Sequence, residues 1–151
     1  MNNPHFVIAG ERRSGSTTLY ELLKQHPGID LFPVADMDYF IKSSLFESRK
    51  WIVDFDKDED WEKENSPEGY KGLFKDLDFS KKVGQKDADL FFWHKAHPRL
   101  AKYLPDTKFI FVLRNPIKRA ESQYWNEFGK GREWKSFNEA LTLEKERSEA
   151  S

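Results

Sequence analysis

The sequence predicts an α/β fold, in which strands and helices alternate along the chain. Two short apolar runs, residues 5–9 and 109–113, have the composition of buried strands, and each leads through a polar loop into a segment with helical spacing. Strand–loop–helix units of this kind pack as a parallel sheet covered by helices. At 151 residues the chain has the length of one domain, so residues 1–151 are expected to form a single domain.

The first half of the chain is expected to contain two strands and three helices. Residues 5–9 form the first strand. Leu19, Leu22 and Leu23 recur at helical spacing, which predicts a helix over residues 16–25 that ends at the turn formed by residues 26–28. A short strand is expected over residues 29–32, and two further helices over residues 37–45 and 66–77.

In the second half, a strand over residues 83–87 and a helix over residues 97–104 precede the apolar strand 109–113. Because that strand is apolar throughout, it is expected to be buried on both faces. Asn115 is suited to cap the next helix, residues 116–128, and Pro116 to occupy its first turn. Ser136 and Glu139 have the spacing of a capping box for a last helix over residues 137–146.

The loop after the first strand has the composition of an anion-binding site. It contains two glycines, two arginines and a run of hydroxyl residues, and it leads directly into a helix. Backbone N–H groups at a helix N-terminus point at a bound anion, and the helix dipole adds to the attraction. Gly10 and Gly15 have the spacing of the loop of nucleotide triphosphatases, but Ser16 stands where that pattern requires lysine. A kinase or triphosphatase, and an ordinary strand–turn–helix unit, remain as alternatives.

A second candidate anion site follows the strand over residues 109–113. Arg114 leaves this strand at its carboxyl end, and Ser122 lies about two turns into the next helix. Open parallel sheets bind their ligands at the carboxyl ends of the strands. Two anion sites at two strand ends indicate a nucleotide that carries phosphates at separated positions.

These two segments resemble the phosphate motifs of sulfotransferases that use 3′-phosphoadenosine 5′-phosphosulfate (PAPS). The run from Arg13 to Thr18 resembles the family's 5′-phosphosulfate loop, and the run from Arg114 to Tyr124 resembles its 3′-phosphate motif. The resemblance extends over residues 6–143. It implies a three-layer, P-loop-like fold with a central parallel sheet. No third basic, glycine-containing segment follows, so the fold is expected to be incomplete at the C-terminus.

The resemblance also implies the reaction and the residues that perform it. PAPS would be the co-substrate, and its sulfuryl group would pass to a hydroxyl or amine of a small-molecule or carbohydrate acceptor. The residues that would bind the donor are Arg12, Arg13, Ser14, Gly15, Ser16, Thr17, Thr18, Arg114 and Ser122. Arg13 would stabilise charge on the leaving phosphate, because a guanidinium is permanently charged. Arg12 has the alternative of a solvated surface residue.

A base and a second cation are also implied by the resemblance. Asp36 falls at the position of the family's glutamate base, although it is equally suited to cap a helix. In another branch of the family a histidine is the base, which makes His94 and His97 candidates. Lys86 matches a family lysine that would lie near the acceptor, with a solvated surface lysine as the alternative. Arg119 is expected to be a surface charge on its helix.

Composition argues against several other classes of protein. The 25 basic residues do not exceed the 26 acidic ones, so nucleic acid binding is not expected. The chain has no cysteine, which excludes disulfides and thiolate metal sites, and no metal is expected. It codes for no apolar run long enough to span a membrane, and its first residues do not resemble a signal peptide, so a cytoplasmic location is expected. A non-catalytic remnant of the fold remains an alternative, and the acceptor and oligomeric state stay open.

Overall fold

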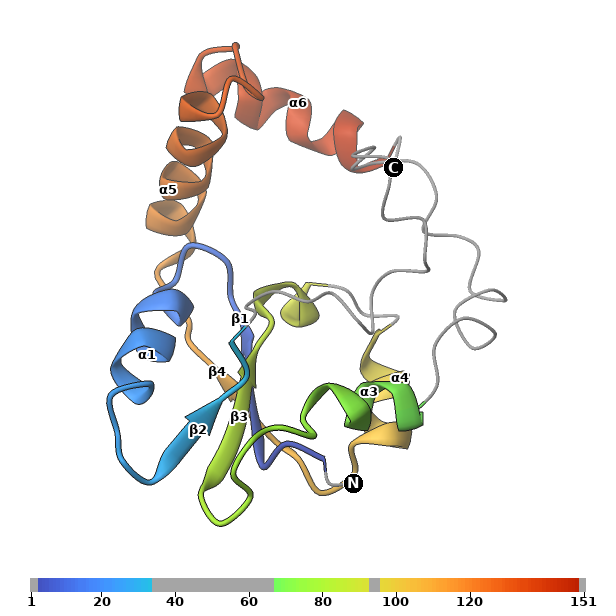
Figure 1. Ribbon diagram of the computed structural model, residues 1–151. Coiled ribbons are helices and arrows are strands. Elements are labelled where there is room, and N and C mark those ends of the chain that lie inside the picture. The colour runs from blue at the N-terminus through green and yellow to red at the C-terminus, as the bar shows by residue number, and fades with distance from the viewer. Residues whose placement is uncertain (1–2, 34–66, 93–95, 150–151) are drawn as a thin grey trace.

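The computed structural model describes residues 3–33, 67–92 and 96–149. Its centre is a parallel sheet of four strands: β1 (Phe6–Gly10), β2 (Ile29–Leu31), β3 (Lys82–Lys86) and β4 (Lys108–Phe111). The strand order is β2-β3-β1-β4, which places β1 between β3 and β4 (Figure 1). The α/β prediction is confirmed, and each strand starts within one residue of its predicted position.

Helices cover both faces of this sheet, as the three-layer prediction requires (Figure 1). On one face, α1 (Ser16–Leu23) packs through Tyr20 against Ile8 and Leu31. On the other face lie α3 (Pro67–Leu73), the 3₁₀ helix η1 (Ala88–Phe91) and α4 (Ala96–Tyr103). Strand alternation separates the two cores, because neighbouring residues of β1 point to opposite faces. The predicted helix over residues 37–45 lies outside the described residues.

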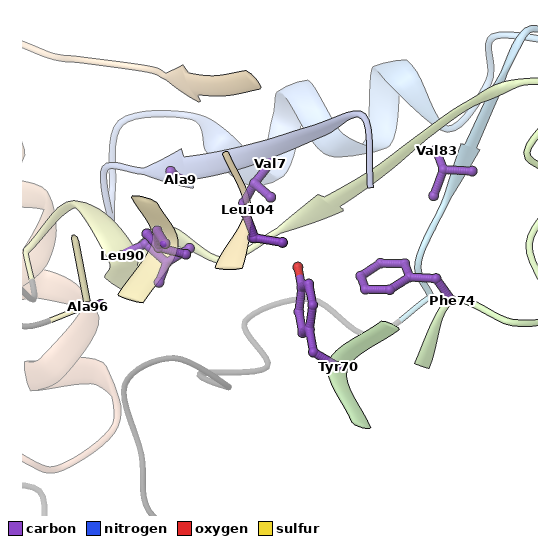
Figure 2. Close-up of a cluster of buried hydrophobic side chains, with 9 residues drawn as sticks. Val7, Ala9, Tyr70, Phe74, Val83, Leu90, Ala96 and Leu104 are labelled. Atoms are coloured by element: carbon purple, nitrogen blue, oxygen red, sulfur yellow. The ribbon is translucent and has the colours of Figure 1, made fainter. Parts of the chain in front are cut away.

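The larger core lies between the sheet and α3, η1 and α4. Figure 2 shows its side chains converging from β1, β3 and these helices. Its buried members are Val7, Ala9, Tyr70, Phe74, Val83, Leu90, Ala96, Leu100 and Leu104. Tyr70 meets Phe74 edge to face, with ring centroids 5.0 Å apart, and its hydroxyl donates a 2.5 Å hydrogen bond to Oε1 of Gln85. This bond satisfies a polar side chain that β3 would otherwise leave unpaired in the core.

The prediction that strand 109–113 is buried on both faces is wrong. The strand itself ends at Phe111, whose side chain is half exposed, and the side chain of Leu113 is more exposed still. Among the described residues, β4 pairs with β1 alone and therefore forms an edge of the sheet. An apolar composition indicates a buried strand only when further elements cover it.

Two long helices follow β4 and extend away from the sheet (Figure 1). The first, α5 (Pro116–Gly129), begins as predicted: Oδ1 of Asn115 accepts hydrogen bonds from the N–H groups of Ile117 and Lys118 at 3.1 and 3.2 Å. The second, α6 (Phe137–Glu149), starts at the predicted capping box, in which Ser136 N–H donates to Glu139 Oε2 at 2.9 Å. These caps fix where both helices begin. For α5 that point is the end of the sheet at which the β1–α1 loop lies.

Candidate functional site

The candidate site begins with the loop between β1 and α1, residues 10–15. The loop is tied to the chain after β4, because Val112 N–H donates to the Gly10 carbonyl at 2.8 Å and Glu11 N–H donates to the Val112 carbonyl at 2.9 Å. Its other side packs against η1. A Cβ on Gly10, where φ is +139°, would lie 2.5 Å from Cβ of Phe91. Only glycine combines this backbone conformation with this close approach.

The N-terminus of α1 has the features of a candidate anion site. Gly15 stands at the N-cap with φ +103°, no side chain from the described part of the protein caps the helix, and its first turn contains no acidic residue. Among residues 3–33, 67–92 and 96–149, the nearest atom to a Cβ on Gly15 would be Cγ1 of Val112 at 4.0 Å, so they leave space above the turn. The Ser14 Oγ is buried and has no hydrogen-bond partner among the described residues. Thr17 and Thr18 are exposed in the first turn, whereas Ser16 is buried. Uncapped N–H groups, hydroxyls and open space fit a phosphate or phosphosulfate group.

The second motif lies directly against this loop. The Arg13 side chain reaches α5, where its Nε donates to Oγ of Ser122 at 3.2 Å and its Nη1 to Oδ1 of Asn126 at 3.3 Å. In the opposite direction, Nη1 of Arg114 donates to the backbone carbonyl of Arg13 at 3.2 Å. Residues more than 100 positions apart in the sequence thus meet at one end of the sheet. Arg13 of the predicted 5′-phosphosulfate loop is therefore a neighbour of Arg114 and Ser122 of the predicted 3′-phosphate motif.

Arg12 lies on the other side of the loop. Its guanidinium forms a two-point ion pair with the carboxylate of Asp89 in η1. The Asp89 side chain is almost fully buried, and the helix that carries it is capped by the buried Asp87. The structure therefore gives Arg12 a carboxylate partner instead of the solvated surface position considered as its alternative. This ion pair joins the loop to η1 and stabilises the loop from the side opposite α5.

Of the other predicted catalytic residues, the structure describes Lys86 and His97. Lys86 ends β3 beside Ile8 of β1 and is only 3% exposed, so the alternative of a solvated surface lysine is wrong. It belongs to the carboxyl edge of the sheet, where the loop also lies. His97 lies in α4, and its Nε2 is 2.8 Å from the Leu90 carbonyl, a contact that joins α4 to η1. Asp36 and His94 lie outside the described residues.

Sequence reasoning missed an ion pair between the two motifs. The Nε of Arg119 in α5 lies 3.0 Å from Oε1 of Glu11 in the loop, and both side chains are partly buried. Arg119 was expected to be a surface charge on its helix, and the structure gives it a partly buried position and a carboxylate partner. Asn126 was missed as well. Neither contact has a local signature, because the partners are more than 100 positions apart and ordinary in type.

A shallow cleft between α5 and α6 lies apart from the phosphate loop and is lined by Tyr124, Phe137 and Glu133, among others. A hydrogen bond from the Arg147 guanidinium, supported by the N–H of Lys135, lowers the pKa of Glu133 from 4.5 to about 2. Its carboxylate therefore stays ionised at neutral pH and fixes the connection between the two helices. These interactions hold α6 on α5.

Comparison with known proteins shows the family to which the chain belongs. Residues 4–149 match the profile described as the Sulfotransferase family. This chain belongs to the sulfotransferase family. The match covers both phosphate motifs and all four strands, so the sulfotransferase resemblance predicted from residues 13–18 and 114–124 is confirmed.

Individual sulfotransferases agree with this assignment. A solved sulfotransferase from Alicyclobacillus acidocaldarius aligns over 99% of this chain and 60% of its own, with a TM-score of 0.78 and 28% identity. Heparan sulfate glucosamine 3-O-sulfotransferase 3B1 of Mus musculus is 28% identical over 140 residues, which are 93% of this chain and 30% of that protein. Bifunctional heparan sulfate N-deacetylase/N-sulfotransferase 2 of Homo sapiens is 29% identical over 85% of this chain and 13% of its own. The chain thus spans less than a third of the length of these curated relatives. Within its described residues, no helix is both long enough and apolar enough to cross a bilayer.

Proposed function

We propose that this sulfotransferase-family chain binds PAPS and transfers its sulfuryl group to a hydroxyl or amine acceptor. The observation that carries the proposal is the contact between the two motifs. Arg114 and Ser122 of the candidate 3′-phosphate site lie 3.2 Å from atoms of Arg13 in the candidate 5′-phosphosulfate loop. A ligand with phosphates at both ends of an adenosine matches two adjacent anion sites better than a nucleotide with one phosphate group.

The loop residues would hold the donor's 5′ end. The N–H groups of the first turn of α1, which no side chain caps among the described residues, would bind the phosphosulfate together with the hydroxyls of Ser14, Thr17 and Thr18. Gly15 keeps the space before these N–H groups clear, and the adjacent Ser16 packs below it. Arg13, with φ +65°, would turn its guanidinium from Ser122 and Asn126 toward the phosphosulfate, where it stabilises negative charge. Arg12 supports the loop through Asp89 and would contribute positive charge from one side.

Transfer also requires a group that takes a proton from the acceptor and cations that stabilise the departing phosphate. PAPS would supply the sulfuryl group, which exchanges its bond to a phosphate oxygen for one to the acceptor. We propose that the Asp36 carboxylate takes the proton from the acceptor. Lys86, which is buried at the carboxyl edge of the sheet beside β1, would supply a further positive charge. The relatives named for heparan sulfate glucosamine sulfation make a carbohydrate the acceptor class to test first.

Titration calorimetry with adenosine 3′,5′-bisphosphate tests the proposal. We expect this nucleotide to bind more tightly than 5′-AMP, and Arg114→Ala to weaken the bisphosphate far more than 5′-AMP. Lys118→Ala is the matched control, because Lys118 is an exposed cation in the first turn of α5, four residues after Arg114, and is paired only with the exposed Glu121 among the described residues. Failure of the folded chain to bind the bisphosphate, or Mg²⁺-dependent ATP hydrolysis in its place, would overturn the proposed function.

A further inference from the structure

We propose that the Glu11–Arg119 ion pair is a positioning contact that fixes the spacing between the two phosphate sites. The inference rests on the proposed donor, since it concerns a ligand that occupies both sites at once. In this role, neither side chain needs to touch the donor. Their contribution is to hold the loop and α5 at the separation that a nucleotide with both phosphates requires.

The geometry of the pair gives it this position. Glu11 stands at the start of the loop, where its N–H is bound to the Val112 carbonyl and its own carbonyl accepts from Ser14 N–H at 3.2 Å. Arg119 stands in the first turn of α5, where its N–H donates to the Asn115 carbonyl at 2.9 Å. Both backbones are therefore fixed locally, and the side-chain bond of 3.0 Å joins the two fixed parts. A change in the distance between the loop and α5 would strain this bond, and the bond would remain in place when Arg13 turns from Ser122 and Asn126 toward the donor.

The charges of the pair explain why a carboxylate is compatible with an anion-binding loop. An isolated Glu11 would repel a phosphate bound a few residues away. Arg119 neutralises it, and the side-chain exposures of 31% for Arg119 and 20% for Glu11 show that water screens the pair only in part. The pair thus adds no net charge to the site. Its effect on binding is expected to come from geometry, which makes it separable from the direct phosphate contacts of Arg13 and Arg114.

A nucleotide with two phosphates gains from a fixed spacing, because binding of the first phosphate presents the second one at a high effective concentration. This gain is lost when the two sites move relative to one another, while the affinity of each site for a single phosphate is unchanged. The ratio of the 5′-AMP dissociation constant to that of adenosine 3′,5′-bisphosphate therefore reports the spacing. A residue that only stabilises the fold has no reason to alter this ratio in a folded protein.

The test measures this ratio by calorimetry in the full chain carrying Glu11→Gln and Arg119→Gln together, a change that leaves the net charge unaltered. We expect the ratio to fall about fivefold, the upper range for a partly exposed ion pair, with the 5′-AMP affinity unchanged. The matched control replaces Lys118 and Glu121 by Gln, which removes an exposed ion pair of the same helix with a 3.2 Å contact. This control should leave the ratio at the wild-type value.

Three results would overturn the inference. An unchanged ratio in the folded double variant refutes the positioning role alone, because the wild type still shows its preference for the bisphosphate. An equal fall in the control variant refutes it as well, since any charge on α5 would then suffice. A wild type that binds neither nucleotide refutes the proposed function and the inference together. If the double variant does not fold, the ratio is measured in the single variant Glu11→Gln. Removal of a negative charge should by itself strengthen anion binding. A fall in the ratio therefore supports the positioning role, and a rise refutes it.

Discussion

The two glycines of the β1–α1 loop should respond differently to alanine, although both have positive φ. At Gly10 the new methyl group would lie 2.5 Å from Cβ of Phe91 and 3.1 Å from the Ala88 carbonyl. At Gly15 it would meet nothing nearer than Cγ1 of Val112 at 4.0 Å. Both substitutions strain the backbone, but only Gly10→Ala also forces the loop away from η1.

The contacts give the size of the difference. Holding a non-glycine residue in such a conformation costs about 1–3 kcal/mol. Overpacking at Gly10 adds about 1–3 kcal/mol, because the atoms it would meet belong to a side-chain root and a backbone carbonyl. For a chain of this length each kcal/mol lowers the Tm by about 2–4 °C. We therefore expect Gly10→Ala to lower the Tm by about 10 °C and Gly15→Ala by about half as much.

The affinity for the nucleotide should be lowered more by Gly15→Ala than by Gly10→Ala, the reverse of the effect on Tm. The methyl group of Gly15→Ala would stand in the open space before the uncapped N–H groups of α1 and keep a phosphate from approaching them. Its affinity for adenosine 3′,5′-bisphosphate should fall about tenfold or more, equivalent to about 1.4 kcal/mol. Thermal melts followed by circular dichroism, together with calorimetry below the melting range, measure both effects. Equal losses of Tm in the two variants, or wild-type binding by a folded Gly15→Ala protein, would refute this reasoning.

Three further predictions concern stability. Tyr70→Phe should lower the free energy of unfolding by about 1–3 kcal/mol in urea denaturation, because the buried Gln85 oxygen loses its donor; an unchanged midpoint would show that the oxygen finds another. Arg12→Met should destabilise the protein more than Asp89→Asn, because it leaves a buried carboxylate without its ion pair, whereas Arg12 is 37% exposed to water; the reverse order of urea midpoints would contradict this. The lowered pKa of Glu133 means that its bond to Arg147 stabilises the fold above pH 4.5 and that this contribution is lost as the pH falls toward 2. The Tm difference between wild type and Glu133→Gln should therefore shrink over that range, and a constant difference would show that ionisation of Glu133 is not responsible.

Local signals in the sequence predicted the parts of the fold that depend on neighbouring residues. Asn115 and Pro116 predicted where α5 begins, and Ser136 with Glu139 predicted the start of α6, because caps act over three or four residues. The two phosphate motifs were recognised for the same reason. Each is a short run whose residue types and spacing are set by one strand end and one helix.

Contacts between distant segments could not be predicted in this way. The Arg12–Asp89 and Glu11–Arg119 pairs join residues of common types that lie 77 and 108 positions apart. The exposure of Phe111 depends on what covers an edge of the sheet, which an apolar run does not reveal. The predicted roles of Arg13, Arg114 and Ser122 stay predictions, although the structure brings all three together.

The position of β1 at the centre of the sheet has a consequence for protein engineering. The loop after β1 takes its supports from the two neighbouring strands' connections: η1 after β3 and the β4–α5 segment (Figure 1). These supports are short and close in space. Insertions that leave η1 and the β4–α5 segment intact should therefore keep this loop in place, which marks these two connections as the ones to preserve when the chain is redesigned.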